Sequence, residues 1–207
     1  MGVIMKKEIR ESLIVVARQL FSQKGAENTT MRDIAQASGK GRRTLYTYFE
    51  SKEDIYYAVI ESELDRLNDM LVEIACRNTC PQEKIIELIK IHLSMMRQAF
   101  TWNSNLQTNI YRNIWAVEKI RKHVDSVESE LFENVLAEGK EGGEFEIDNI
   151  KLTANLLHYC IKGLEVPYIL GHIDKGIKEE DINLQIASFF SGMLRKNKVE
   201  LSIQKEQ

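Results

Sequence analysis

Proline, alternating apolar runs and long uncharged stretches are all scarce in this 207-residue chain. It has only two prolines, Pro81 and Pro167, and few β-branched runs with the two-residue alternation of a half-buried strand. No uncharged stretch approaches the roughly 18 residues that a membrane-spanning helix needs. The sequence therefore predicts a helical protein that does not enter a membrane.

Cysteine is also sparse, because Cys76, Cys80 and Cys160 are the three in the chain. The opening residues MGVIMKK lack the apolar core of a secretory signal peptide, so we expect a cytoplasmic protein with free thiols. Cys76 and Cys80 have a chelating spacing, but no second Cys or His pair follows closely, and zinc takes four ligands. We therefore predict two ordinary thiols in a loop, with no metal and no cofactor.

The charge is unevenly distributed along the chain, although its net value is only −3. Residues 1–53 contain ten Lys and Arg against six Asp and Glu, which gives +4 and leaves −7 for the other 154 residues. A basic N-terminal part on an acidic remainder directs phosphate groups to one end of a molecule. Chance clustering of charge is the alternative.

Residues 29–41 have the pattern of a short helix followed by a glycine turn. The hydroxyl of Thr30 can accept a hydrogen bond from a free amide one turn later, and Asp33 can reach back as a capping box. The helix would start at Met31, and Gly39 would supply the left-handed residue that ends it.

A second short helix is predicted from the residues RRTLYTYF after Gly41. Leu45 and Phe49 lie four residues apart and can pack on the first helix, which leaves the basic face open. Arginine can bind guanine with two hydrogen bonds in the major groove, while threonine and tyrosine can bind phosphate oxygens. The candidate residues for binding double-stranded DNA are Thr30, Lys40, Arg42, Arg43, Thr44, Tyr46, Tyr48 and Lys52.

The residues TTMRDIAQASG, followed by TLYTYFESKEDI, are similar to the N-terminal DNA-binding domain of the TetR family of transcriptional regulators. The resemblance covers roughly residues 8–62 and is most specific at Ile34-Ala35, Gly39, Leu45-Tyr46-x-Tyr48-Phe49 and Ser51-Lys52. It implies an all-α fold of about nine helices. A three-helix helix-turn-helix domain (1–53) would precede a larger helical ligand-binding and dimerisation domain (54–207).

The sequence departs from the family pattern after Gly39, where Lys40 and Gly41 replace the usual apolar residue and serine or threonine. The second helix therefore lacks a good side-chain cap, and it stays open which of Lys40, Arg42 and Arg43 binds a base. Lys52 falls in the first turn of the next helix, where free amides and the helix dipole favour an anion. We expect it to bind DNA phosphate, with a solvated surface lysine as the alternative.

The remaining chain predicts further amphipathic helices, over residues 51–74, 81–100, 106–114, 116–138, 148–170 and 180–195. An apolar cavity among them could hold a small organic effector. Its candidate lining residues are Met96, Phe100, Trp102, Tyr111, Trp115 and His158. These residues fit an ordinary hydrophobic core equally well. Histidines such as His92 and His158 are more often core or surface residues than residues that bind a ligand.

The last two predicted helices carry more apolar residues than a single small helical domain needs for its core. Gly163, which has no side chain, would let the backbone of another helix come close. In the TetR family the corresponding helices join two protomers, which implies a homodimer and a palindromic DNA site. The candidate interface residues are Leu156, Tyr159, Gly163, Ile186, Phe189, Phe190 and Met193.

Catalytic signatures are absent, since there is no Gly-x-Ser-x-Gly, P-loop, Gly-x-Gly-x-x-Gly after a strand or His-Glu-x-x-His. We therefore predict no catalytic residues and no enzymatic activity. The resemblance implies a ligand-responsive regulator, a repressor that a small-molecule inducer releases from its operator. An all-helical small-molecule-binding protein or enzyme without DNA binding is the alternative.

Overall fold

The computed structural model describes residues 2–100, 106–173 and 175–194, and side chains within these ranges except at 2–4, 99–100, 106–120, 179 and 193. All secondary structure in this part of the chain is helical, which confirms the predicted all-α fold. The helices are α1 (Gly2–Lys24), α2 (Met31–Ala37), α3 (Arg42–Tyr48), α4 (Lys52–Ala75), α5 (Pro81–Phe100), α6 (Leu106–Glu141), α7 (Ile150–Ile169) and α8 (Glu179–Leu194). Within these ranges, no helix is long and apolar enough to span a bilayer.

One prediction about the helices was wrong. Two helices were expected over residues 106–114 and 116–138, but α6 runs through both as a single helix of 36 residues. The physical reason is that neither glycine nor proline occurs between Leu106 and Glu138, so nothing in the sequence interrupts the helix. The described part of the chain therefore has eight helices rather than about nine.

The first three helices and the start of α4 form a small head with its own core. Leu13, Ala17 and Phe21 of α1 are fully buried against Ile34 of α2 and Leu45 of α3. Gly25 ends α1 in the left-handed conformation, with φ of 85°.

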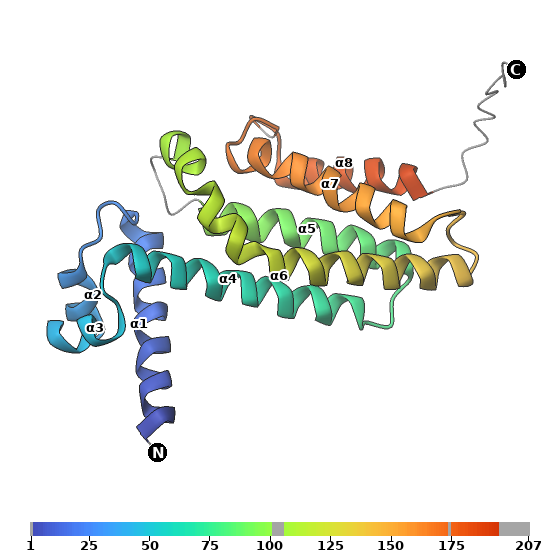
Figure 1. The fold of residues 1–207 in the computed structure, drawn as a ribbon. Coiled ribbons are helices and arrows are strands. Elements are labelled where there is room, and N and C mark those ends of the chain that lie inside the picture. The colour runs from blue at the N-terminus through green and yellow to red at the C-terminus, as the bar shows by residue number, and fades with distance from the viewer. Residues whose placement is uncertain (1, 101–105, 174, 195–207) are drawn as a thin grey trace, which may run out of the picture.

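The other helices form the body, in which α5 and α6 pack between α4 on one side and α7 on the other (Figure 1). α8 packs against α5. Leu71, Leu88, Phe132 and Leu157 are fully buried in this second core.

α4 joins the two parts because it belongs to both cores (Figure 1). Ile55 and Val59 lie in the core of the head, whereas Leu64 and Leu71 lie in that of the body. The start of α4 is fixed by a capping box between Ser51 and Asp54. A rigid helix that enters both cores couples the orientation of the head to the packing of the body.

Candidate nucleic-acid interface

The start of α2 has the geometry that the sequence predicts. The Asp33 amide donates to Thr30 Oγ1 over 3.2 Å, and the Thr30 amide donates to Asp33 Oδ2 over 2.8 Å. Lys24 Nζ also lies 2.8 Å from Asp33 Oδ2. The hydrogen bond from Lys24, followed by those from Thr30, holds the pKa of Asp33 well below its usual range. The carboxylate therefore stays charged and fixes the first turn of α2 to the end of α1.

A tight turn then sets the angle between α2 and α3. Gly39 adopts a φ of 64°, and the amides of Gly39 and Lys40 donate to the carbonyls of Gln36 and Ala35. Gly41 is the N-cap of α3 and provides no side-chain hydrogen bond, as the departure from the family pattern predicts. The first turn of α3 is therefore held by its buried side chains rather than by a cap.

Two buried side chains seat α3 against the rest of the head. Leu45 and Phe49 are buried, and the guanidinium of Arg10 lies 5.3 Å from the centre of the Phe49 ring. This packing leaves the opposite face of α3 to solvent. Arg42 and Arg43 are exposed there.

The predicted DNA-binding residues all belong to the head, where they lie at the start of α2, in the α2–α3 turn, on α3 and at the start of α4. Lys40, Arg42, Arg43 and Tyr46 are exposed, as is Thr30, while the others are half-buried; these are Thr44, Tyr48 and Lys52. The exposed arginines meet the first requirement of a major-groove reader, because a base edge can be reached only by an exposed side chain.

Lys52 has a structural role that sequence reasoning missed. Its ammonium group donates to the carbonyls of Ala26, over 2.9 Å, and Glu27, over 3.3 Å. The alternative of a freely solvated lysine is therefore wrong. The bonds hold the connection between α1 and α2 against the first turn of α4.

A buried carboxylate joins the head to the body. Glu63 of α4 accepts hydrogen bonds from Arg18 of α1 over 3.2 Å and from Arg66 over 2.9 Å. Sequence reasoning did not find this contact, although a charged residue on the buried stripe of α4 signals a paired side chain. A cleft of about 310 Å³ lies beside it, between α1 and Gln98 of α5, and is lined by Val15, Arg18, Gln19, Ser22, Gln23 and Gln98.

The predicted effector cavity is only partly within the described side chains. Met96 is buried in the core of the body, and His158 is largely buried on α7. The side chains of Phe100, Tyr111 and Trp115, and all of Trp102, lie outside the described residues. The cavity therefore stays a prediction.

The centre of the body instead holds a buried network of charged side chains. His92 of α5 is fully enclosed, with Nδ1 2.5 Å from Glu128 Oε1 of α6 and Nε2 2.7 Å from Glu165 Oε1 of α7. Arg121 of α6 donates to both oxygens of Glu165, over 2.7 Å and 2.5 Å. This pairing ties three helices together through polar contacts inside an apolar core.

The network keeps His92 positively charged. Burial alone lowers the pKa of His92, but the charge of Glu128 and the hydrogen bonds with Glu128 and Glu165 raise it to about 9. Burial likewise raises the pKa of both carboxyls, yet their cationic partners lower each to about 2. At neutral pH both ring nitrogens of His92 therefore donate to charged carboxylates.

Three further side chains extend the network toward the surface, and Arg121 links it to one of them, Asp125, over 3.8 Å. His158 Nδ1 lies 3.2 Å from Glu128 Oε2, and Lys162 Nζ lies 2.7 Å from Asp125 Oδ2. The interpretation of His92 as a core histidine is confirmed. The burial of Glu128 could have been predicted from the sequence. It lies four residues from both Val124 and Phe132, which are buried, and therefore on the apolar stripe of α6.

The predicted interface residues of α7 and α8 differ in their exposure within the protomer. Tyr159, Phe189 and Leu156 are 72%, 59% and 52% exposed, and Gly163 is also exposed. Ile186 is half-buried, and the Met193 side chain lies outside the described residues. Phe190 is a correction, because it is 0% exposed: its ring packs into the protomer core and is not available to a partner.

Residues 13–59 match the sequence profile of the family described as "Bacterial regulatory proteins, tetR family". An HTH-type transcriptional regulator of Staphylococcus aureus (strain USA300) is 42% identical over 59 residues, which are 28% of this chain and 32% of that protein. This chain thus spans about a third of the length of that relative.

Two solved structures resemble nearly the whole chain. A transcriptional regulator from Cytophaga hutchinsonii superimposes with a TM-score of 0.73 and 21% identity over 90% of this chain and 98% of that one. The regulator FadR from Bacillus subtilis, solved in complex with stearoyl-CoA, gives a TM-score of 0.60 and 14% identity over 89% of this chain and 99% of that one. At these identities the likeness concerns the fold alone.

Proposed function

The chain belongs to the TetR family of bacterial regulatory proteins, and on that premise we propose that it is a ligand-responsive transcriptional repressor of the cytoplasm. It binds a palindromic operator as a homodimer and is released by a small-molecule inducer. The observation that carries the proposal is the exposed pair Arg42 and Arg43 on a helix that Leu45 and Phe49 hold in the head.

The roles of the basic residues follow from their positions. Arg42 and Arg43 lie at the start of α3, the end that enters the major groove in a helix-turn-helix protein. Arg43 reads a base, and the other candidates fix the head on the phosphates; these are Thr30, Lys40, Arg42, Thr44, Tyr46, Tyr48 and Lys52.

A homodimer places two such heads on one duplex. The exposed apolar side chains of α7 and α8 support an interface between copies, because Tyr159 and Phe189 would otherwise lie in water. Two-fold symmetry then matches a palindromic site whose halves lie one DNA turn apart.

The inducer is a small organic molecule that binds within the body. The FadR structure with stearoyl-CoA supports a body of this fold as a ligand-binding unit. Because α4 enters both cores, a ligand that favours another packing of the body changes the spacing of the heads. It must prefer the released form by a few kcal/mol, since equal affinity for both forms shifts nothing.

The proposal is tested with full-length protein and DNA selected from a random library. We expect a palindromic consensus, and an affinity that falls linearly with the logarithm of salt concentration. Arg43→Ala should weaken binding to the consensus by about 1–3 kcal/mol and remove the preference for one base at the position that Arg43 contacts. Lys52→Ala should weaken binding to all sequences alike. Thr47→Ala is the matched control on α3, because its hydroxyl already donates to the Arg43 carbonyl.

Failure to bind any duplex at low salt would refute the proposed function. Equal losses from Arg43→Ala and Lys52→Ala on consensus and random DNA would refute the division between base and phosphate contacts. The inducer is sought by mass spectrometry of molecules that purify with the protein, followed by release of the selected duplex on adding each one.

A further inference from the structure

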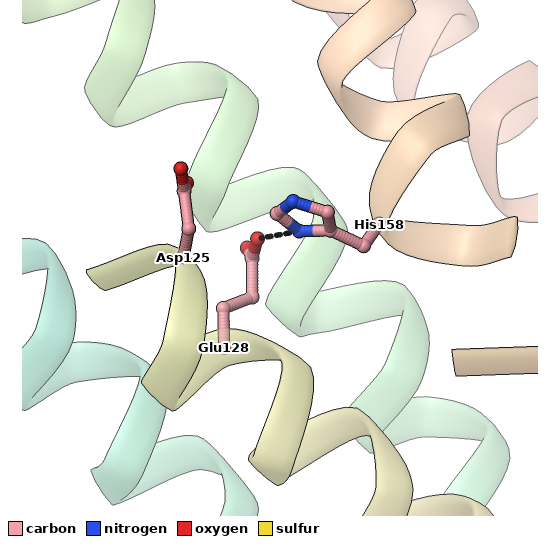
Figure 2. A group of neighbouring side chains, drawn as sticks. All are labelled: Asp125, Glu128 and His158. Atoms are coloured by element: carbon pink, nitrogen blue, oxygen red, sulfur yellow. Dashed lines mark hydrogen bonds and ion pairs between the residues drawn. The ribbon is translucent and has the colours of Figure 1, made fainter. Parts of the chain in front are cut away.

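Three potential metal ligands converge in the body on the solvent side of the charged network. They are Asp125 and Glu128, which lie three residues apart on α6, and His158 on α7. One ligand atom from each lies within 4.8 Å of the other two (Figure 2). We propose that these side chains form a binding site for one divalent first-row transition-metal ion.

The spacing of the donor atoms suits such an ion. Zinc ligands about 2.1 Å from the metal lie roughly 3.0–3.4 Å apart at octahedral and tetrahedral angles. Glu128 Oε2 and His158 Nδ1 are 3.2 Å apart, so an ion can bind both with little movement. One Asp125 oxygen lies within 4.8 Å of these two atoms, so a change of rotamer would bring this carboxylate onto the same ion.

The chemistry of the donors narrows the kind of ion. One imidazole and two carboxylates favour Zn²⁺, Mn²⁺ or a neighbouring divalent ion over soft, thiolate-binding ions. Three protein ligands leave coordination positions open for water or for an oxygen atom of another molecule. Sites of this construction occur between facing helices of bundles, as α6 and α7 are here.

The surrounding residues already hold the donors in place. The second oxygen of Glu128 pairs with His92, and His92 is held in turn by Glu165. Such outer contacts orient metal ligands and are expected around a site that binds an ion. His158 and Asp125 keep side-chain exposures of 12% and 18%, which gives an ion a path from solvent.

Two cations compete with the proposed ion for Asp125. The guanidinium of Arg121 lies 3.8 Å from Asp125 Oδ1. Lys162 Nζ lies 2.7 Å from Asp125 Oδ2, and its side chain is 19% exposed. Its long, flexible chain can turn toward solvent when a metal binds Asp125. Removing the charge of this lysine in Lys162→Met should therefore strengthen metal binding. In a cluster held only by ion pairs, the same change would merely leave Asp125 paired with Arg121 alone.

The test measures bound metal on the full chain and is independent of DNA binding, so its failure leaves the proposed function standing. Untagged protein carrying Cys76→Ser and Cys80→Ser removes the two exposed thiols as ligands. After treatment with a chelator, equilibrium dialysis against Zn²⁺ and, separately, Mn²⁺ is followed by elemental analysis. We expect one ion per chain and, with Co²⁺, an absorption spectrum of nitrogen and oxygen ligands.

His158→Ala and Asp125→Asn should each lower the affinity at least tenfold, and Lys162→Met should raise it. His123→Ala is the matched control, because His123 lies on the same helix but is exposed. Circular dichroism confirms that each variant is folded. The proposal is overturned if the parent protein retains no more Zn²⁺ or Mn²⁺ than His158→Ala, or if His123→Ala removes the ion.

Discussion

Lys52 Nζ donates a 2.9 Å hydrogen bond to the carbonyl of Ala26, and so joins the first turn of α4 to the connection between α1 and α2. The same ammonium group also reaches the carbonyl of Glu27. A residue expected to bind phosphate therefore also fixes the shape of the head that would present α3 to DNA.

The first prediction is that Lys52→Ala destabilises the protein as well as weakening its affinity for DNA. The loss should be about 1 kcal/mol, because two carbonyls lose a charged donor at a half-buried position. Urea denaturation measures it. Lys40→Ala is the control, because that exposed side chain should leave the stability unchanged within about 0.5 kcal/mol. Equal stabilities of the two variants would show that Lys52 does not support the head.

The sequence predicted the local features of the head well. The Thr30–Asp33 capping box and the turn at Gly39 each depend on residues within a few positions of one another. The bond from Lys52 to Ala26 spans 26 residues, and that from His92 to Glu165 spans 73, so neither has a local signature. The buried charges of α6 and α7 were visible in the sequence, but their partners were fixed only when the helices packed.

The second prediction concerns the uncapped start of α3. Gly41 has the extended conformation of an N-cap, and a Cβ there would meet only Thr44 Oγ1 at 3.9 Å. In Gly41→Ser the new hydroxyl oxygen should accept a hydrogen bond from the Thr44 amide, and the side chain should reduce the freedom of the unfolded chain. We expect a gain of about 0.5 kcal/mol, read as a higher melting temperature. A lower melting temperature would mean that the backbone at Gly41 does not tolerate a side chain.

The third prediction tests the buried network. His92→Ala removes the cation between Glu128 and Glu165 and leaves both carboxylates buried with fewer partners. Breaking a buried charge pair in this way typically costs about 3–5 kcal/mol, which urea denaturation would detect. His123→Ala, at an exposed position of α6, should cost less than about 0.5 kcal/mol. A loss below 1 kcal/mol for His92→Ala would contradict a charged His92 at the centre of the body.

The fourth prediction concerns the exposed apolar side chains of the last two helices. Tyr159→Glu places a charge where the side chain is 72% exposed in the protomer, so folding should be unaffected while a contact between copies is lost. Sedimentation velocity should show a dimer for the parent protein, as the proposed function requires, and a monomer for the variant. Val72→Glu, at an exposed apolar position of α4, should remain dimeric. If Tyr159→Glu remains dimeric, the dimer interface does not include this face of α7.

The fifth prediction separates the stability of the protomer from that of the dimer at Gly163. Apart from its chain neighbours and the nearby backbone of α7, no atom of the described residues lies within 4 Å of a Cβ added there. Alanine is also about 1 kcal/mol better than glycine inside a helix. Gly163→Ala should therefore stabilise α7 when the protein is diluted to monomers. If the glycine allows the partner's backbone to come close, the same methyl group should weaken the dimer, because it would keep the two helices apart. Unfolding and sedimentation equilibrium measured over a range of concentrations resolve the two effects, and a dimer as tight as that of the parent would exclude a close helix crossing at Gly163.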